Sequence, residues 1–150
     1  MIYWFIGQPG CGKTTLAKML KKQFESLGHD SILHIDGDDL RNIFGNNYNK
    51  ENFTKEYRIQ QLEILQRFIG YIADQGITVM VSTVSPYRDV RDNFKKLRKD
   101  VKEIYVFTNE LRGRESFHSK EFDEPVDNFI PICTSNMSPE ESLKILWNLI

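Results

Sequence analysis

The stretch that decides the fold runs Ile2-Tyr3-Trp4-Phe5-Ile6 and continues as Gly7-Gln8-Pro9-Gly10-Cys11-Gly12-Lys13-Thr14-Thr15. Its first five residues are apolar and favour a buried β-strand, and a helical pattern over residues 13–27 follows the glycines. A strand, a loop with the spacing Gly-x-x-x-x-Gly-Lys-Thr and a helix, in this order, are typical of a phosphate-binding loop. An ordinary glycine turn that opens a helix is the alternative, but it gives no reason for the lysine and the threonine. The stretch therefore predicts a loop that wraps the phosphates of a nucleoside triphosphate.

The residue types in this loop match the needs of ATP bound with Mg²⁺. Its glycines let backbone N–H groups approach a phosphate at dihedral angles that a Cβ would block. Lys13 supplies a positive charge to the β- and γ-phosphates, and the hydroxyl of Thr14 is a ligand for Mg²⁺. Cys11 is more simply a small loop residue than a nucleophile. We therefore expect ATP and Mg²⁺ as cofactors and Lys13 as a catalytic residue, with the nucleotide held by Gly7, Pro9, Gly10, Cys11, Gly12, Lys13, Thr14 and Thr15.

Length and composition favour one compact domain over residues 1–150. The chain has 150 residues, of which 40% are hydrophobic, and this is enough for one core. Because 20 basic residues face 21 acidic ones, we expect no surface for nucleic acid or an anionic membrane. No run of about 18 apolar residues predicts a membrane span, and the start of the chain lacks the features of a signal peptide. The two cysteines are far apart and indicate neither a zinc site nor a disulfide scaffold, so a cytoplasmic, reduced setting is expected.

Apolar strands and helical stretches alternate along the rest of the chain, without repeats or linkers. This order predicts an α/β fold, a P-loop NTPase-type three-layer sandwich in which helices flank a mostly parallel sheet. Ligands of such folds bind beyond the carboxyl ends of the strands. Further strands are expected at residues 31–35, 77–84, 103–107 and 130–133, a turn at 45–47, and further helices at 38–44, 53–75, 88–99 and 138–150.

Acidic and basic side chains follow the second expected strand, in the run Asp36-Gly37-Asp38-Asp39-Leu40-Arg41. A carboxylate here can accept the proton of an acceptor hydroxyl or hold water on Mg²⁺, and Asp36 is the best candidate for this role. The guanidinium of Arg41 suits a substrate phosphate. Asp38 or Asp39 has a structural alternative, since either one can cap the following helix. The run therefore predicts the acceptor side of a phosphoryl-transfer site.

The third expected strand carries no acidic residue at its end, which argues against a mechanical ATPase. It runs instead into Ser85-Pro86-Tyr87-Arg88-Asp89-Val90-Arg91-Asp92. This turn presents a hydroxyl, an aromatic ring and two arginines at the same edge of the sheet, which would suit an anionic substrate that contains a ring. A strand end broken by proline and followed by a solvated charged helix is the structural alternative.

Together these segments resemble the adenylylsulfate kinase family, through Gly7 to Thr15, Asp36-Gly37-Asp38-x-x-Arg41 and Ser85-Pro86-Tyr87-Arg88-x-x-Arg91-Asp92, over about residues 2–107. The resemblance implies transfer of the γ-phosphoryl of Mg-ATP to the 3′-hydroxyl of adenylyl sulfate, a step of sulfate assimilation. It implies that Asp36 is the catalytic base and shares the metal with Thr14. The acceptor pocket that it implies contains Arg41, Phe53, Arg58 and the backbone of Val84, Ser85 and Pro86. Asp38 and Arg88 are further candidates for binding the acceptor.

Two segments depart from the family's pattern. Gln61-Leu62-Glu63 stands where the family usually has Asn-Ile-Arg, and a short lid-like segment at about 109–128 replaces a long Lys- and Gly-rich lid. Arg112 and Arg114 in this segment are candidates for the ATP phosphates, and Phe117 or Phe122 would cover a base. A solvated loop is the structural alternative for this segment.

Three functions therefore stay open for the chain. The first is a kinase for adenylyl sulfate. The second is a P-loop kinase for another nucleotide, a nucleotide-activated compound or a small alcohol. The third is a nucleotide-binding module without turnover. The expected partners are ATP and a small anionic nucleotide-like substrate. Trp147 is more simply a packing residue of the core or an edge, and a homodimer is the alternative, in which an exposed helix around Trp147 would offer the contact.

Overall fold

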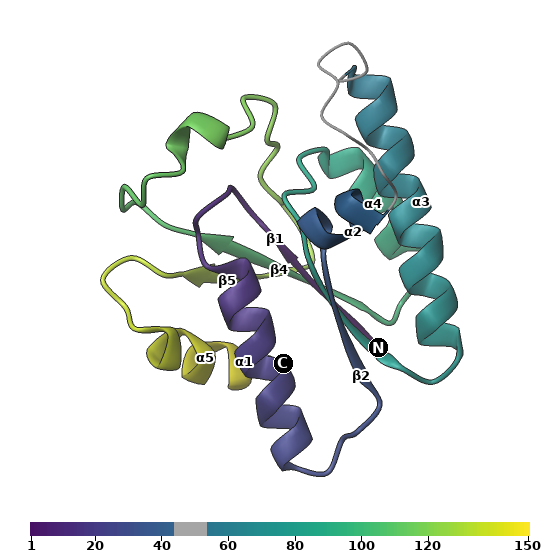
Figure 1. Cartoon of the computed structure of the whole chain (residues 1–150), viewed down its shortest axis with the longest axis vertical. Helices are drawn as coiled ribbons and strands as arrows, with labels where there is room; N and C mark the ends of the chain where they lie inside the picture. The colour runs from purple at the N-terminus through teal and green to yellow at the C-terminus, as the bar shows by residue number, and fades with distance from the viewer. Residues whose placement is uncertain (44–53) are drawn as a thin grey trace.

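The computed structural model describes residues 1–43 and 54–150, with the side chain of Arg41 outside the description. In these residues five strands form one parallel sheet in the order β2-β3-β1-β4-β5 (Figure 1). The strands are β1 (Ile2–Ile6), β2 (Ile32–Asp36), β3 (Thr78–Ser82), β4 (Val101–Phe107) and β5 (Phe129–Cys133). The predicted α/β fold with a parallel sheet is confirmed.

Helices cover both faces of the sheet, and β1 shows why. Its residues alternate between two cores, because successive side chains of a strand point to opposite faces. Tyr3 and Phe5 pack against α1 (Lys13–Ser26) and α5 (Pro139–Trp147), while Ile2, Trp4 and Ile6 pack against α3 (Lys55–Asp74) and α4 (Arg88–Leu97). A fully apolar strand is thus buried on both sides, as a central parallel strand requires.

The ends of the elements depart from the predicted bounds by a few residues, for identifiable reasons. Helix α3 begins at Lys55 because the side chain of Thr54 accepts a hydrogen bond from the backbone N–H of Tyr57. Helix α5 begins after Ser138, which forms a reciprocal capping box with Glu141. The short helix α2 (Gly37–Ile43) follows β2 directly. The predicted turn at 45–47 lies outside the described residues.

The carboxyl ends of β1, β2 and β3 meet at one edge of the sheet, where the glycine loop, Asp36 and the turn around Ser85 follow them. Residues 108–128 leave this edge after β4, contain the short 3₁₀ helix η2 (Glu115–Phe117) and return to β5 (Figure 1, green). None of the helices in the described part of the chain is both long and apolar enough to cross a membrane.

Candidate active site

The glycine loop is shaped by backbone conformations that only glycine adopts easily. Gly7, Gly10 and Gly12 have φ of 141°, 86° and 99°. A Cβ on Gly7 would lie 2.1 Å from the carbonyl oxygen of Val106 in β4. The loop is therefore held against β4 at a distance that no other residue at position 7 permits.

Lys13 begins α1 and folds back over the loop. Its side chain is 9% exposed, and its Nζ donates a hydrogen bond to the carbonyl oxygen of Gln8 at 2.8 Å. Burial lowers the pKa of Lys13, and the nearby charge of Arg114 acts in the same direction. An anion bound in the loop would restore the preference for the charged form, so the site is built for phosphate.

Thr14 and Asp36 connect the loop to the end of β2. The hydroxyl of Thr14 donates to Oδ2 of Asp36 at 2.6 Å, and Oδ1 of Asp36 accepts from the backbone N–H of Asp38 at 2.9 Å. Searched over residues 1–43 and 54–150, the chain shows no cluster of three or more His, Cys, Asp or Glu side chains for a metal. One hydroxyl and one carboxylate fit Mg²⁺, which keeps several waters and binds substrate phosphates in preference to a cage made by protein alone.

A cleft of about 1450 Å³ runs from this loop toward the start of α3. At one end it is lined by predicted residues of the ATP site, and at the other by predicted residues of the acceptor site: Pro9, Gly10, Gly12, Lys13, Thr14, Thr15, Asp36, Asp38, Arg58, Ser85, Pro86 and Arg114. One cavity therefore brings together most of the predicted site.

Among the predicted residues whose side chains the structure describes, Gly7, Cys11, Arg88 and Arg112 do not line the cleft. Gly7 and Cys11 support the loop from beneath. Arg88 donates to the backbone oxygen of Glu124 at 3.3 Å, on the outer side of the turn. Arg41 lies in α2, but its side chain and the whole of Phe53 are outside the described residues.

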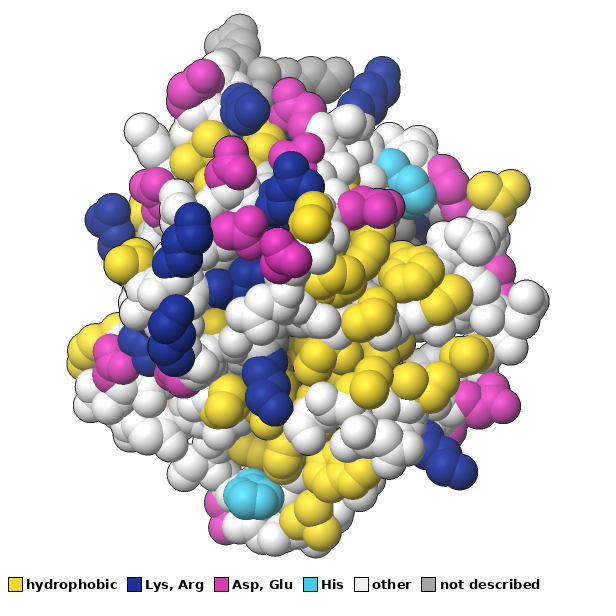
Figure 2. Space-filling model, turned by 180° about the vertical axis from the view of Figure 1, so that it is seen from behind, with side chains coloured by type: hydrophobic (Ala, Val, Ile, Leu, Met, Phe, Trp, Pro, Cys, Tyr) yellow, Lys and Arg dark blue, Asp and Glu magenta, His cyan; other side chains and the backbone are white. Residues whose placement is uncertain are grey.

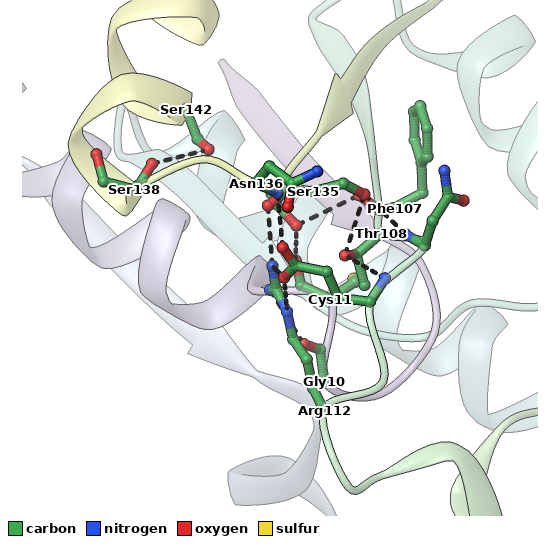
Figure 3. A network of polar contacts seen from close by, with 12 residues as sticks. Gly10, Cys11, Phe107, Thr108, Arg112, Ser135, Asn136, Ser138 and Ser142 are labelled. Carbon is green, nitrogen blue, oxygen red and sulfur yellow. Dashed lines mark hydrogen bonds and ion pairs between the residues drawn. The ribbon is translucent and has the colours of Figure 1, made fainter.

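The two arginines of the lid-like segment take different positions. Arg112 lies against the outside of the loop, where it pairs with Glu110 at 2.7 Å and donates to the carbonyl oxygen of Thr134 at 2.9 Å (Figure 3). Arg114 lines the cleft, with its side chain against Gly10 and its guanidinium 5.7 Å from the ring of Phe117. Only Arg114 faces the space that the phosphates would fill.

A further link between loop and lid-like segment was missed by the sequence analysis. The amide of Gln8 donates to the carbonyl oxygen of Ser119 and accepts from its backbone N–H, both at 2.9 Å. The ring of His118 contacts the carbonyl oxygen of Pro9 at 3.2 Å. No local pattern signals these contacts, because the partners are more than 100 residues apart.

At the far end of the cleft, residues that the sequence predicts meet Glu121 of the lid-like segment, which the sequence did not single out. Oη of Tyr87 donates to Oε2 of Glu121 at 2.8 Å, and the same oxygen lies 3.8 Å from Nη1 of Arg58. Burial, and next the bond to Glu121, raise the pKa of Tyr87. Apolar side chains complete this end of the cleft, among them Leu62, Leu65 and Phe68. The combination of charged groups and an apolar wall suits a nucleotide.

A family model for adenylylsulphate kinase matches residues 1–121 of the chain. The chain belongs to the adenylylsulfate kinase family. Family membership makes it an ATP-dependent kinase that uses ATP with Mg²⁺, in agreement with the loop, Thr14 and Asp36. A module without turnover is thereby set aside.

Three relatives illustrate the range of the family's neighbours. The chain is 29% identical over 148 residues to a cytidine diphosphoramidate kinase of Campylobacter jejuni, covering 96% of this chain and 84% of that one. It is 30% identical over 145 residues to an adenylyl-sulfate kinase of Clostridium acetobutylicum, covering 93% and 70%. The solved structure of the Mycobacterium tuberculosis APS kinase in complex with AMPPNP and APS matches with a TM-score of 0.81 at 20% identity, covering 99% of this chain and 95% of that one.

Proposed function

We propose that this kinase transfers the γ-phosphoryl group of ATP to a hydroxyl of a nucleotide-like acceptor, with the 3′-hydroxyl of adenylyl sulfate as the first candidate. The observation that carries the proposal is the position of Asp36. Its carboxylate accepts a hydrogen bond from Thr14 of the ATP loop, and Asp36 lines the same cleft as Ser85, Pro86 and Arg58. A base between the ATP end and the acceptor end of the cleft can accept the proton of a hydroxyl that enters from the acceptor end.

In the proposed phosphoryl transfer, each residue has a role at a particular atom. The acceptor oxygen attacks the γ-phosphorus while Asp36 takes the hydroxyl proton, the bond from that phosphorus to the β–γ bridging oxygen breaks, and ADP leaves. Lys13 and Arg114 offset the charge on the transferring group. Mg²⁺, held through Thr14 and Asp36, would supply charge neutralisation at the β- and γ-oxygens.

A second acceptor class, a nucleotide that ends in a phosphoramidate, is favoured by one feature of the cleft. The carboxylate of Glu121 lies beside Arg58 and offsets its charge at the acceptor end. A fully anionic terminal group gains less from such a pair than from a lone arginine, whereas an N–H donor can bond the carboxylate. The Campylobacter jejuni relative, a cytidine diphosphoramidate kinase, supports testing this class.

The proposal covers one kinase domain with residues 109–128 as its lid-like segment. It keeps the cytoplasmic setting that the composition predicts, since Cys11 and Cys133 are both free thiols. It also keeps the homodimer, but with a different contact. Trp147 is half-buried and packs against Phe24 beside the core, with ring centroids 5.3 Å apart.

A contact for the homodimer is offered instead by a cluster of half-buried aromatic rings, from Tyr105 and Phe107 in β4, Phe129 in β5 and Phe122 of the lid-like segment. The ring of Tyr105 contacts those of Phe107, Phe122 and Phe129. The view from behind shows hydrophobic side chains gathered beside the charged helices (Figure 2). Sedimentation velocity would check the assembly: a Phe129→Ser variant is expected to shift a dimer toward monomer.

The decisive experiment is an assay of ATP consumption against adenylyl sulfate, cytidine diphosphoramidate, other nucleotides and small alcohols, with mass analysis of each product. Gain of one phosphoryl group by a nucleotide acceptor is expected, and the acceptor with the highest kcat/KM identifies the substrate. Asp36→Asn should lower kcat by roughly 10²–10⁴-fold and leave the fold unchanged. Turnover of none of the nucleotides, or full activity of Asp36→Asn, would overturn the proposal.

A further inference from the structure

Helix α4 carries two basic side chains, Arg91 and Lys95, that are buried beside Phe94, whereas its other charged side chains are at least partly exposed. Arg91 and Glu103 of β4 have side chains that are 0% exposed, and Nε of Arg91 donates to Oε1 of Glu103 at 2.7 Å. Lys95 contacts the other oxygen, Oε2, of the same carboxylate. Lys95 also lies 3.1 Å from Oδ1 of Asp92, so two basic and two acidic side chains meet here, and what sets Arg91 apart is the binding of its remaining nitrogens.

The remaining nitrogens of Arg91 bind the backbone of two other segments. Nη1 donates to the carbonyl oxygen of Ser85 and Nη2 to that of Asp123, both at 2.6 Å. Ser85 lines the cleft and adopts a φ of 45°, which is unusual for a residue with a side chain. One guanidinium therefore joins β4, the turn after β3 and the end of the lid-like segment.

The end of the lid-like segment is held against this turn from both sides. The backbone N–H of Asp123 donates to the carbonyl oxygen of Pro86 at 2.8 Å, while its own carbonyl oxygen accepts from Arg91. Lys95 donates to the carbonyl oxygen of Asp127 at 3.1 Å and extends the attachment toward β5. Two residues before Asp123, Glu121 reaches the hydroxyl of Tyr87 and forms the wall of the cleft.

We propose that Arg91 is a positioning residue for the acceptor: by binding Ser85 and Asp123 at once, it fixes the distance between the turn and the Glu121 wall. The inference rests on the proposed function of this end of the cleft. The planar fork of arginine reaches three acceptors in fixed directions, which an ammonium group on a flexible chain cannot reproduce. The ATP end of the cleft makes no bond to Arg91 among those described for the chain.

The substitution Arg91→Lys tests this role, since it keeps a buried positive charge beside Glu103 and removes the fork. The matched control is Arg98→Lys at the end of the same helix, where a guanidinium binds Asp74 and Asp100 away from the cleft. We expect Arg91→Lys to raise KM for the acceptor roughly tenfold to a hundredfold and to leave KM for ATP within about twofold. Arg98→Lys should leave both KM values within about twofold. A far-ultraviolet spectrum of each variant checks the fold.

Hydrogen exchange tests the same proposal without any acceptor. The amide of Asp123 should exchange at least about tenfold faster in Arg91→Lys than in the wild type, and at the wild-type rate in Arg98→Lys. A wild type that phosphorylates no acceptor would sink the proposed function and leave this exchange result intact. Unchanged exchange, an unchanged acceptor KM, or an equal rise of both KM values would overturn the role of Arg91.

Discussion

The two ends of the cleft are built in different ways. The ATP end comes from one contiguous run, Gly7 to Thr15, and its shape lies in backbone dihedrals and in the contact of Gly7 with β4. The acceptor end is assembled from side chains of separate segments, among them Arg58 of α3, Tyr87 before α4 and Glu121 of the lid-like segment. A site made by backbone tolerates few substitutions, whereas a wall of side chains can change one residue at a time. This contrast agrees with two relatives of the chain that are both named as kinases but for different acceptors.

The largest effect should come from filling the space at Gly7. In Gly7→Ala, the new Cβ would overlap the carbonyl oxygen of Val106 at 2.1 Å, and φ of 141° adds strain. We expect Kd for Mg-ATP to rise by more than roughly a hundredfold, measured by titration calorimetry. Gly76→Ala is the control, since φ there is 82° but no atom lies within 4 Å of the new Cβ. Tight ATP binding by Gly7→Ala would break the contrast between the two ends.

The next largest effect should be a difference in kcat between variants of the two arginines in the lid-like segment. Arg114 lines the cleft near Lys13, so Arg114→Ala should lower kcat by roughly 10²–10³-fold through loss of charge stabilisation at the transferring group. Arg112→Ala removes the contacts with Glu110 and Thr134 outside the cleft and should lower kcat less than about tenfold. Steady-state kinetics with saturating ATP checks both. Equal losses would mean that the two arginines share one role.

A smaller effect is expected at the acceptor end. Tyr87→Phe removes the hydroxyl that donates to Glu121 and keeps the ring. Because Glu121 is 53% exposed, water replaces much of this bond, and KM for the acceptor should rise only about threefold to tenfold. KM for ATP should stay the same. A rise of KM for ATP instead of KM for the acceptor would show that the two ends of the cleft do not act independently.

The same contrast explains how far the sequence could predict the structure. The loop, Asp36 and the order of the elements follow from local patterns, because a strand, its loop and the next helix are neighbours in the chain. The prediction that Arg91 is presented to an anionic substrate at the edge of the sheet was wrong, because its side chain is fully buried and does not line the cleft. Arg91 lies in a helix whose charges predict a solvated surface, and its burial depends on Glu103 in β4 and on the backbone of Asp123. The pairing of Gln8 with Ser119 is equally invisible to a local pattern.

The smallest predicted effect is a pH dependence of ATP binding that arises from Lys13. Burial lowers the pKa of Lys13 in the free protein, whereas bound phosphates would raise it. Between these two pKa values the free lysine is neutral and the bound lysine is charged, so binding takes up a proton and affinity falls as pH rises. The pH window lies above the lowered pKa and extends to at least about 10.4, the ordinary value for lysine.

Calorimetry in buffers of different ionisation enthalpy should show more proton uptake at about pH 9.5 than at about pH 7.5. In Lys13→Arg the guanidinium stays charged, so uptake should vanish there. Equal uptake at both pH values in the wild type would mean that the charge of Lys13 does not change on binding, and that the ATP end relies on its backbone more than on this side chain.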